Sequence, residues 1–146
     1  MDRLKKTLIV IIPLLVGGLI YIIFRVDTLI MFRWFESIGI QDLIIFLRSL
    51  KSEINLPEWI IYSLPDGLWI FSFTYCMLVI WDFKLTKNSF FWITIAPIIG
   101  LVSELGQLIN IVPGTFDIVD LIIVTLSTAI PFLYLRNFKS IKNLFL

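Results

Sequence analysis

The stretch that decides the fold covers residues 90–135 and reads FFWITIAPIIGLVSELGQLINIVPGTFDIVDLIIVTLSTAIPFLYL. Two long apolar runs flank the dipeptide Pro113-Gly114, and the only charged residues are Glu104, Asp117 and Asp120. About 20 apolar residues in a helix cross the hydrocarbon core of a bilayer, and Pro-Gly pairs mark turns. The stretch therefore predicts two antiparallel membrane-spanning helices, at about 90–112 and 116–135, joined by a tight turn.

The rest of the chain extends this pattern, because hydrophobic residues make up 59% of the 146 residues and aromatic residues 15%. A soluble domain of this length is much less apolar. Two further runs with few or no charges, at about 7–24 and 64–81, predict two more spans. We expect an all-α membrane protein with a four-transmembrane-helix bundle, which forms a single transmembrane domain over residues 1–146.

The segment between the first two spans has a different pattern, since charged residues interrupt its apolar residues. Between about 26 and 52 the apolar side chains recur near helical spacing, with a break near Gly39. We expect an interfacial amphipathic segment of two short helices, which lie in the headgroup plane with their charges in water. A small extramembrane cap that packs on the spans is an equal alternative.

The expected topology follows from the lysine and arginine residues, because cytoplasmic loops carry an excess of them. With four spans, the N-terminus, the connector 82–89 and the C-terminal tail share one side, and they hold Arg3, Lys5, Lys6, Lys84, Lys87, Arg136, Lys139 and Lys142. We expect a multi-pass protein of the bacterial inner membrane with both termini in the cytoplasm. The first span is expected to be an uncleaved anchor, and a cytoplasmic anionic ligand could dock at the basic face.

Six polar side chains near the span ends form the candidate polar intramembrane site: Asp66, Glu104, Gln107, Asn110, Asp117 and Asp120. In the expected topology all six converge on the outer half of the membrane. Glu104 precedes the end of its span by about seven residues, which places it roughly 10 Å below the outer boundary. Its helix face also carries Pro97 and Gly100, and we expect the stripe that starts at Asp117 and Asp120 to face it from the next helix.

Helix capping is the alternative explanation for part of this set, because helix N-termini favour aspartate. The residues from Ser63 to Asp66 read as a capping box, and Thr115 is a candidate cap ahead of Asp117. Glu104 has no such role, and an acid inside a span indicates a functional site. Its structural alternative is a neutral glutamic acid that hydrogen-bonds across helices.

Three motifs of the chain resemble the VanZ-like family of small bacterial membrane proteins: Glu104-Leu-Gly-Gln107, the Pro113-Gly114 turn and Asp117-Ile-Val-Asp120. In that family a Glu-x-x-Gln motif ends one helix, a Pro-Gly-Arg turn follows, and the next helix opens with acids. Asp66 matches a family aspartate, and the chain departs from the family pattern at Gly67, Ile70, Thr115, Val124 and Ser127. The resemblance implies a role at the bacterial envelope, with glycopeptide resistance the best-known association.

The residue types narrow the chemistry, because the chain has no histidine and a single cysteine, Cys76. It therefore has no Ser-His-Asp triad, no His-ligated zinc site and no intramolecular disulfide. We expect no cofactor and no metal site. An intramembrane enzyme that uses Glu104 with Asp117 or Asp120 as an acid–base pair ranks below a non-enzymatic role, since a carboxylate pair alone is a weak signal.

Two non-enzymatic functions rank above that enzyme. The first is a homo-oligomeric ion channel or pore-forming effector, in which several copies line a conduit with acidic and amide side chains. The second is a VanZ-like envelope protein that binds a lipid-linked precursor or a glycopeptide. The expected partners are membrane lipids and further copies of the chain, and nothing in the sequence indicates nucleic acid.

Overall fold

The computed structural model describes residues 2–49, 51 and 54–136, and in this part of the chain the structure is helical with no strand. Lys139 and Lys142 of the expected basic tail lie outside the described residues. The helices in chain order are α1 (Arg3–Phe24), α2 (Ile30–Ser37), α3 (Gln41–Ser49), α4 (Glu58–Tyr62), α5 (Leu64–Ile80), α6 (Lys87–Leu108) and α7 (Ile118–Arg136). The expectation of an all-α protein is confirmed.

Three helices are long and apolar enough to cross a membrane: α1 and α6, with 22 residues each, and the 18 residues Ile118–Leu135 of α7. The remaining predicted span corresponds to α5, which is apolar but has 17 residues. At 1.5 Å per residue its length is about 26 Å, compared with about 30 Å for the hydrocarbon core. The chain is thus consistent with a membrane protein, and a fourth crossing by α5 stays a prediction.

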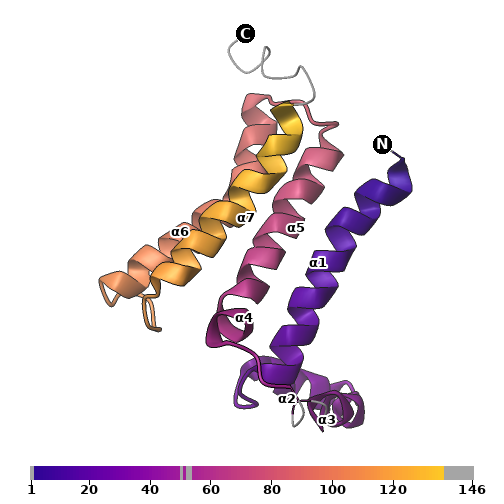
Figure 1. The fold of residues 1–146 in the computed structure, drawn as a ribbon, viewed down its shortest axis with the longest axis vertical. Helices are drawn as coiled ribbons and strands as arrows, with labels where there is room; N and C mark the ends of the chain where they lie inside the picture. The colour runs from indigo at the N-terminus through magenta and orange to yellow at the C-terminus, as the bar shows by residue number, and fades with distance from the viewer. Residues whose placement is uncertain (1, 50, 52–53, 137–146) are drawn as a thin grey trace.

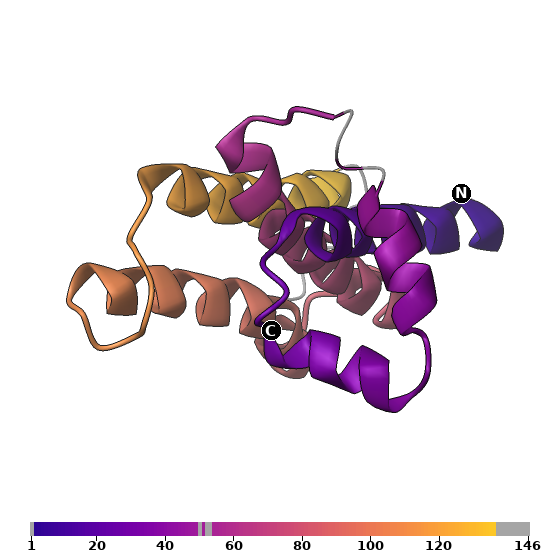
Figure 2. The ribbon, with the colours of Figure 1, turned by 90° about the horizontal axis from the view of Figure 1, so that it is seen from below.

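Helix α5 is the centre of the arrangement, since α1, α6 and α7 each pack against it. Figures 1 and 2 show α1 on one side of α5 and the pair α6 and α7 on the other. Small residues allow the close approach, because a Cβ atom on Gly100 of α6 would lie 2.7 Å from Ile70 Cδ1 and 3.3 Å from Val124 Cγ1. The predicted faces of α6 and α7 are therefore in contact, and α5 packs over this contact.

The end of α5 that leads into α6 is closed by an apolar core, made of Tyr75, Leu78, Phe83, Leu85, Ile93 and Leu135. We call these six residues the closed end. The chain turns there through Asp82 and Phe83, whose φ angles are 50° and 56°. Thr86 and Ser89 then form a reciprocal capping box that starts α6. The buried side chains and the capping box together fix the path of the chain from α5 to α6.

The segment between α1 and α5 folds across the opposite end (Figure 1). Helices α2 and α3 confirm the two short helices predicted there, and Gly39 between them has a φ angle of 76°. Arg48 of α3 fixes this helix against the end of α1, because its Nη1 donates to the carbonyl oxygens of Ile22 and Arg25 at 3.0 and 2.9 Å. The last carbonyl groups of a helix have no N–H donor within the helix, and Arg48 supplies one here. The location of α2 and α3 in a headgroup layer stays a prediction, and the sequence reasoning missed α4.

The predicted end of the third span is wrong, because α6 ends at Leu108 instead of continuing to residue 112. The backbone N–H groups of Ile111 and Val112 both donate to the carbonyl oxygen of Gly106, at 2.9 and 3.1 Å. Asn110 takes a left-handed conformation with a φ angle of 57°, which is the usual way for a helix to stop. The chain therefore leaves the helix four residues earlier than its hydrophobicity suggested.

Candidate functional site

A cavity of about 490 Å³ lies at the end of α5 opposite the closed end. It is formed by the start of α5, the end of α6, the turn that follows and the start of α7. Its lining consists of Arg25, Glu58, Trp59, Tyr62, Ser63, Asp66, Glu104, Gln107, Pro113, Gly114, Thr115, Asp117 and Asp120. We call it the polar cavity, because charged and polar side chains make up most of this lining.

The structure brings together five of the six predicted site residues, since the polar cavity includes Asp66, Glu104, Gln107, Asp117 and Asp120. Asn110 is not among them. It is exposed in the turn after α6, in a left-handed conformation that asparagine tolerates. Because α6 ends early, Glu104 precedes its end by four residues, or roughly 6 Å at 1.5 Å per residue, and its depth below a membrane boundary stays a prediction.

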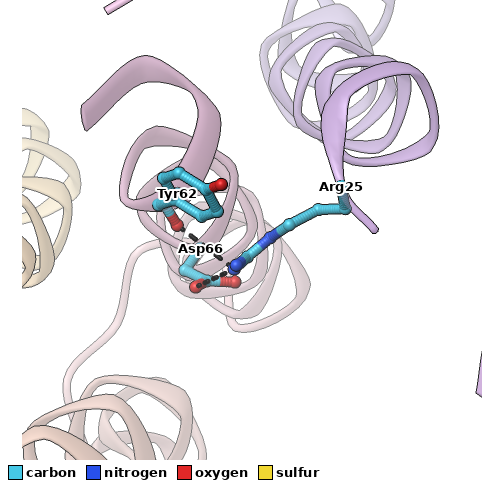
Figure 3. Close-up of polar contacts among 3 residues, drawn as sticks. All are labelled: Arg25, Tyr62 and Asp66. Atoms are coloured by element: carbon cyan, nitrogen blue, oxygen red, sulfur yellow. Dashed lines mark hydrogen bonds and ion pairs between the residues drawn. The ribbon is translucent and has the colours of Figure 1, made fainter. Parts of the chain in front are cut away.

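The polar cavity also contains a cation that sequence reasoning missed. Arg25 follows α1, and its Nη2 lies 3.9 Å from Asp66 Oδ2 and donates to the carbonyl oxygen of Tyr62 at 3.4 Å (Figure 3). The guanidinium also stands over the rings of Tyr21 and Tyr62, at 5.1 and 5.0 Å from their centroids. Its position at the very end of the first span was an available signal, of the same kind that singled out Asp66.

Helix capping accounts for one of the acids. Asp117 Oδ1 accepts a hydrogen bond from the backbone N–H of Val119 at 2.8 Å, which is the geometry of an N-cap. Asp117 thus supplies the cap that was predicted for Thr115. The predicted capping box at Ser63 is wrong, because Ser63 makes no side-chain hydrogen bond to the start of α5, and Asp66 pairs with Arg25 instead.

Gln107 is positioned by the turn that follows α6. Gly114 has a φ angle of 141°, and a Cβ atom on it would lie 2.8 Å from Gln107 Cδ. Only glycine combines this conformation with such a close approach. The turn and the Gln107 amide therefore hold each other in place at the wall of the polar cavity.

The charges of the polar cavity are unbalanced. Its lining contains five carboxylates, those of Glu58, Asp66, Glu104, Asp117 and Asp120, and one guanidinium. Two carboxylate oxygens, Glu104 Oε2 and Asp120 Oδ1, are buried without a hydrogen-bond partner among the described residues. Buried acceptors without donors are costly. The site can therefore accept a ligand that brings N–H donors and positive charge, and its described acids do not form a group of three that could hold a metal ion.

A second cavity, of about 640 Å³, adjoins the first. Its walls come mainly from α1, α5 and α6, with apolar side chains that include Val10, Leu14, Trp69, Phe73 and Ile99. We call it the apolar groove. Asp66 and Glu104 line both the apolar groove and the polar cavity. These two acids therefore stand where a polar compartment joins an apolar one, an arrangement that no motif in the sequence predicted.

Comparison with known proteins gives no family: no family model, no curated protein and no solved structure matches the chain. The resemblance to the VanZ-like family accordingly rests on the motifs around Glu104, Pro113 and Asp117 alone.

Proposed function

We propose that the chain is a protein of the bacterial envelope that binds an ammonium-bearing polar group of an envelope molecule in the polar cavity. The observation that carries this proposal is the imbalance of five carboxylates against Arg25, with Glu104 Oε2 and Asp120 Oδ1 buried and lacking donors among the described residues. A primary ammonium supplies three N–H donors and one positive charge. A lipid-linked precursor or a glycopeptide that carries an amine has this chemistry.

The position of the acids supports binding over an ion channel built from several copies. The carboxylates converge inside one chain, whereas the exposed side chains of α6 and α7 include Ile98, Val102, Leu105, Ile122 and Leu126. An oligomeric pore needs polar side chains on the faces that meet around the shared axis. A closed ring of copies whose ion flux in liposomes disappears in Glu104→Gln would favour the channel instead.

We also place the polar cavity on the outer side of the membrane. Arg3, Lys5 and Lys6 lie at the start of α1, and Lys84 lies in the connector before α6. Figure 1 shows the start of α1 and this connector at the opposite end of the helices from the start of α5 and the end of α6, which contribute to the lining of the polar cavity. The positive-inside rule supports a cytoplasmic location for these residues. In a Cys76→Ala background, Glu58→Cys should react with a membrane-impermeant maleimide on whole cells and Lys87→Cys should not. The reverse pattern would contradict the orientation.

Binding is tested by thermal unfolding of the purified protein at neutral pH, with octylammonium as the ligand. Because a ligand that binds only the folded state raises its stability, octylammonium should raise Tm, and octanol and octanoate should raise it less. The increase should be lost in Glu104→Gln and Asp120→Asn and kept in Asp42→Asn, an exposed acid of α3 outside the polar cavity. Equal increases in all variants would contradict the proposal.

A further inference from the structure

The apolar groove has the dimensions of one leaflet. Along α5 its lining runs from Asp66 to Cys76, a separation of ten residue steps that covers roughly 15 Å of helix. The hydrocarbon core of a bilayer is about 30 Å thick, so the groove reaches from the acids to about its midplane. This is the depth to which an acyl chain of a single leaflet extends.

The groove ends at a site with both spare acceptors and spare donors. On one side are the unpartnered oxygens of Glu104 and Asp120. On the other is Arg25, which, among the described residues, has a buried Nε without a partner and an Nη2 whose polar contacts are the long ones to Asp66 and Tyr62, at 3.9 and 3.4 Å. Guanidinium groups suit phosphate and carboxylates suit ammonium. The polar cavity is thus complementary to a group that carries both charges.

The groove itself holds one more unpartnered polar atom. Ser72 lines the groove and is 2% exposed, and its Oγ has no hydrogen-bond partner among the described residues. This hydroxyl is a second polar group in the wall that a ligand in the groove could satisfy. The apolar wall, the acids and the arginine are therefore independent features that one kind of molecule would satisfy together.

We infer that the occupant is a phospholipid with a primary ammonium in its headgroup, of the phosphatidylethanolamine class. Its ammonium binds Glu104 and Asp120, its phosphate binds Arg25, and one acyl chain lies in the apolar groove between α1 and α6. The inference rests on the proposed function, because it identifies the molecule that the polar cavity binds. It adds that the molecule enters from the side, out of the bilayer.

The headgroup is tested with delipidated protein by native mass spectrometry, using phosphatidylethanolamine, phosphatidylcholine and phosphatidylglycerol with identical acyl chains. Choline carries a positive charge but no N–H donor, so phosphatidylethanolamine should bind about tenfold or more tightly, the worth of one hydrogen bond to a charged group. Phosphatidylglycerol should bind weakest. Equal binding of phosphatidylethanolamine and phosphatidylcholine, or stronger binding of phosphatidylglycerol, would overturn the headgroup assignment.

The acyl chain is tested by filling the groove. Leu14→Trp places a larger side chain in the groove wall, and Leu15→Trp makes the same change at an exposed position outside it. Leu14→Trp should weaken all three lipids severalfold and leave their order unchanged, while Leu15→Trp binds as the wild type does. Both variants should retain the wild-type helical circular dichroism. Equal lipid binding by the two variants would overturn the assignment of the acyl chain to the apolar groove.

The single cysteine gives a second measurement without a mutation. Cys76 lines the deep end of the groove and is half-buried. In detergent, at a lipid concentration near the affinity for phosphatidylethanolamine, its alkylation by N-ethylmaleimide should be several times slower with phosphatidylethanolamine than with the same amount of phosphatidylcholine. Equal rates would argue against the inference. If these tests fail while octylammonium still raises Tm through Glu104, only the inference falls; if that increase also fails, the proposed function falls with it.

Discussion

The two ends of α5 differ in their surroundings, since one is packed among apolar side chains and the other lines a charged cavity. At the closed end, Tyr75, Leu78 and Ile93 are fully buried and the next helix starts with a complete capping box. At the other end, the same helices surround a cavity with five carboxylates and one guanidinium, and Ser63 makes no cap hydrogen bond. Side-chain packing and helix capping are thus more complete at the closed end than around the polar cavity. The difference indicates that the closed end holds the helices together, and it supports the proposal that the polar cavity, which is less stable, binds a ligand.

The largest effect should come from the closed end. Leu78→Ala removes a fully buried side chain and should lower the free energy of unfolding by about 2–5 kcal/mol, because a cavity remains. Ile80→Ala, which truncates a side chain that is 63% exposed, is the matched control and should change it little. Unfolding monitored by circular dichroism measures both variants. Equal losses would mean that the closed end does not carry the stability.

The next largest effect should have the opposite sign at the polar cavity. Glu104→Gln in the protein without ligand should raise the free energy of unfolding by about 1–2 kcal/mol, because it removes one of several clustered like charges, whose Oε2 lacks a donor among the described residues. Binding of octylammonium should be lost in the same variant. A less stable Glu104→Gln would instead support the structural alternative, in which Glu104 hydrogen-bonds across the helices. Asp42→Asn is again the control.

A smaller loss is expected when the cation of the polar cavity is removed. Arg25→Gln loses the contacts to Asp66 and to the rings of Tyr21 and Tyr62, together worth about 1 kcal/mol of unfolding free energy. It should also weaken phospholipid binding more than octylammonium binding, since only the phospholipid has a phosphate. Arg33→Gln on the exposed face of α2 provides the comparison. If both ligands weaken equally, Arg25 does not bind phosphate.

The smallest effect is expected at the one polar atom of the closed end. Tyr75 is fully buried, its ring contacts Phe83 and Tyr134, and its hydroxyl has no hydrogen-bond partner among the described residues. Tyr75→Phe keeps the ring and removes the hydroxyl, so it should stabilise the protein by at most about 1 kcal/mol. Tyr134→Phe, at a partly exposed position, should be neutral. A clear destabilisation by Tyr75→Phe would show that the hydroxyl has a partner.

The sequence predicted the parts of this molecule that depend on local patterns. Uncharged runs located the long helices, and helical spacing placed Glu104 and Gln107 on one face. It did not predict Arg25 beside Asp66 or Arg48 at the end of α1, because these contacts join segments that are distant in the chain. The early end of α6 depends on two hydrogen bonds to Gly106 that hydrophobicity does not report. The apolar groove depends on how α1 and α6 lie around α5, which no single segment encodes.

Ligand binding in the polar cavity requires a direct contact between a bound ammonium and Glu104, and solid-state NMR can measure it. The experiment records the dipolar coupling between ¹⁵N-octylammonium and ¹³C-labelled glutamate carboxyl groups in the membrane-embedded protein. We expect a coupling typical of a charge-assisted hydrogen bond, present in the wild type and in Glu36→Gln and lost in Glu104→Gln. No coupling in the wild type, or the same coupling in Glu104→Gln, would contradict the proposed contact.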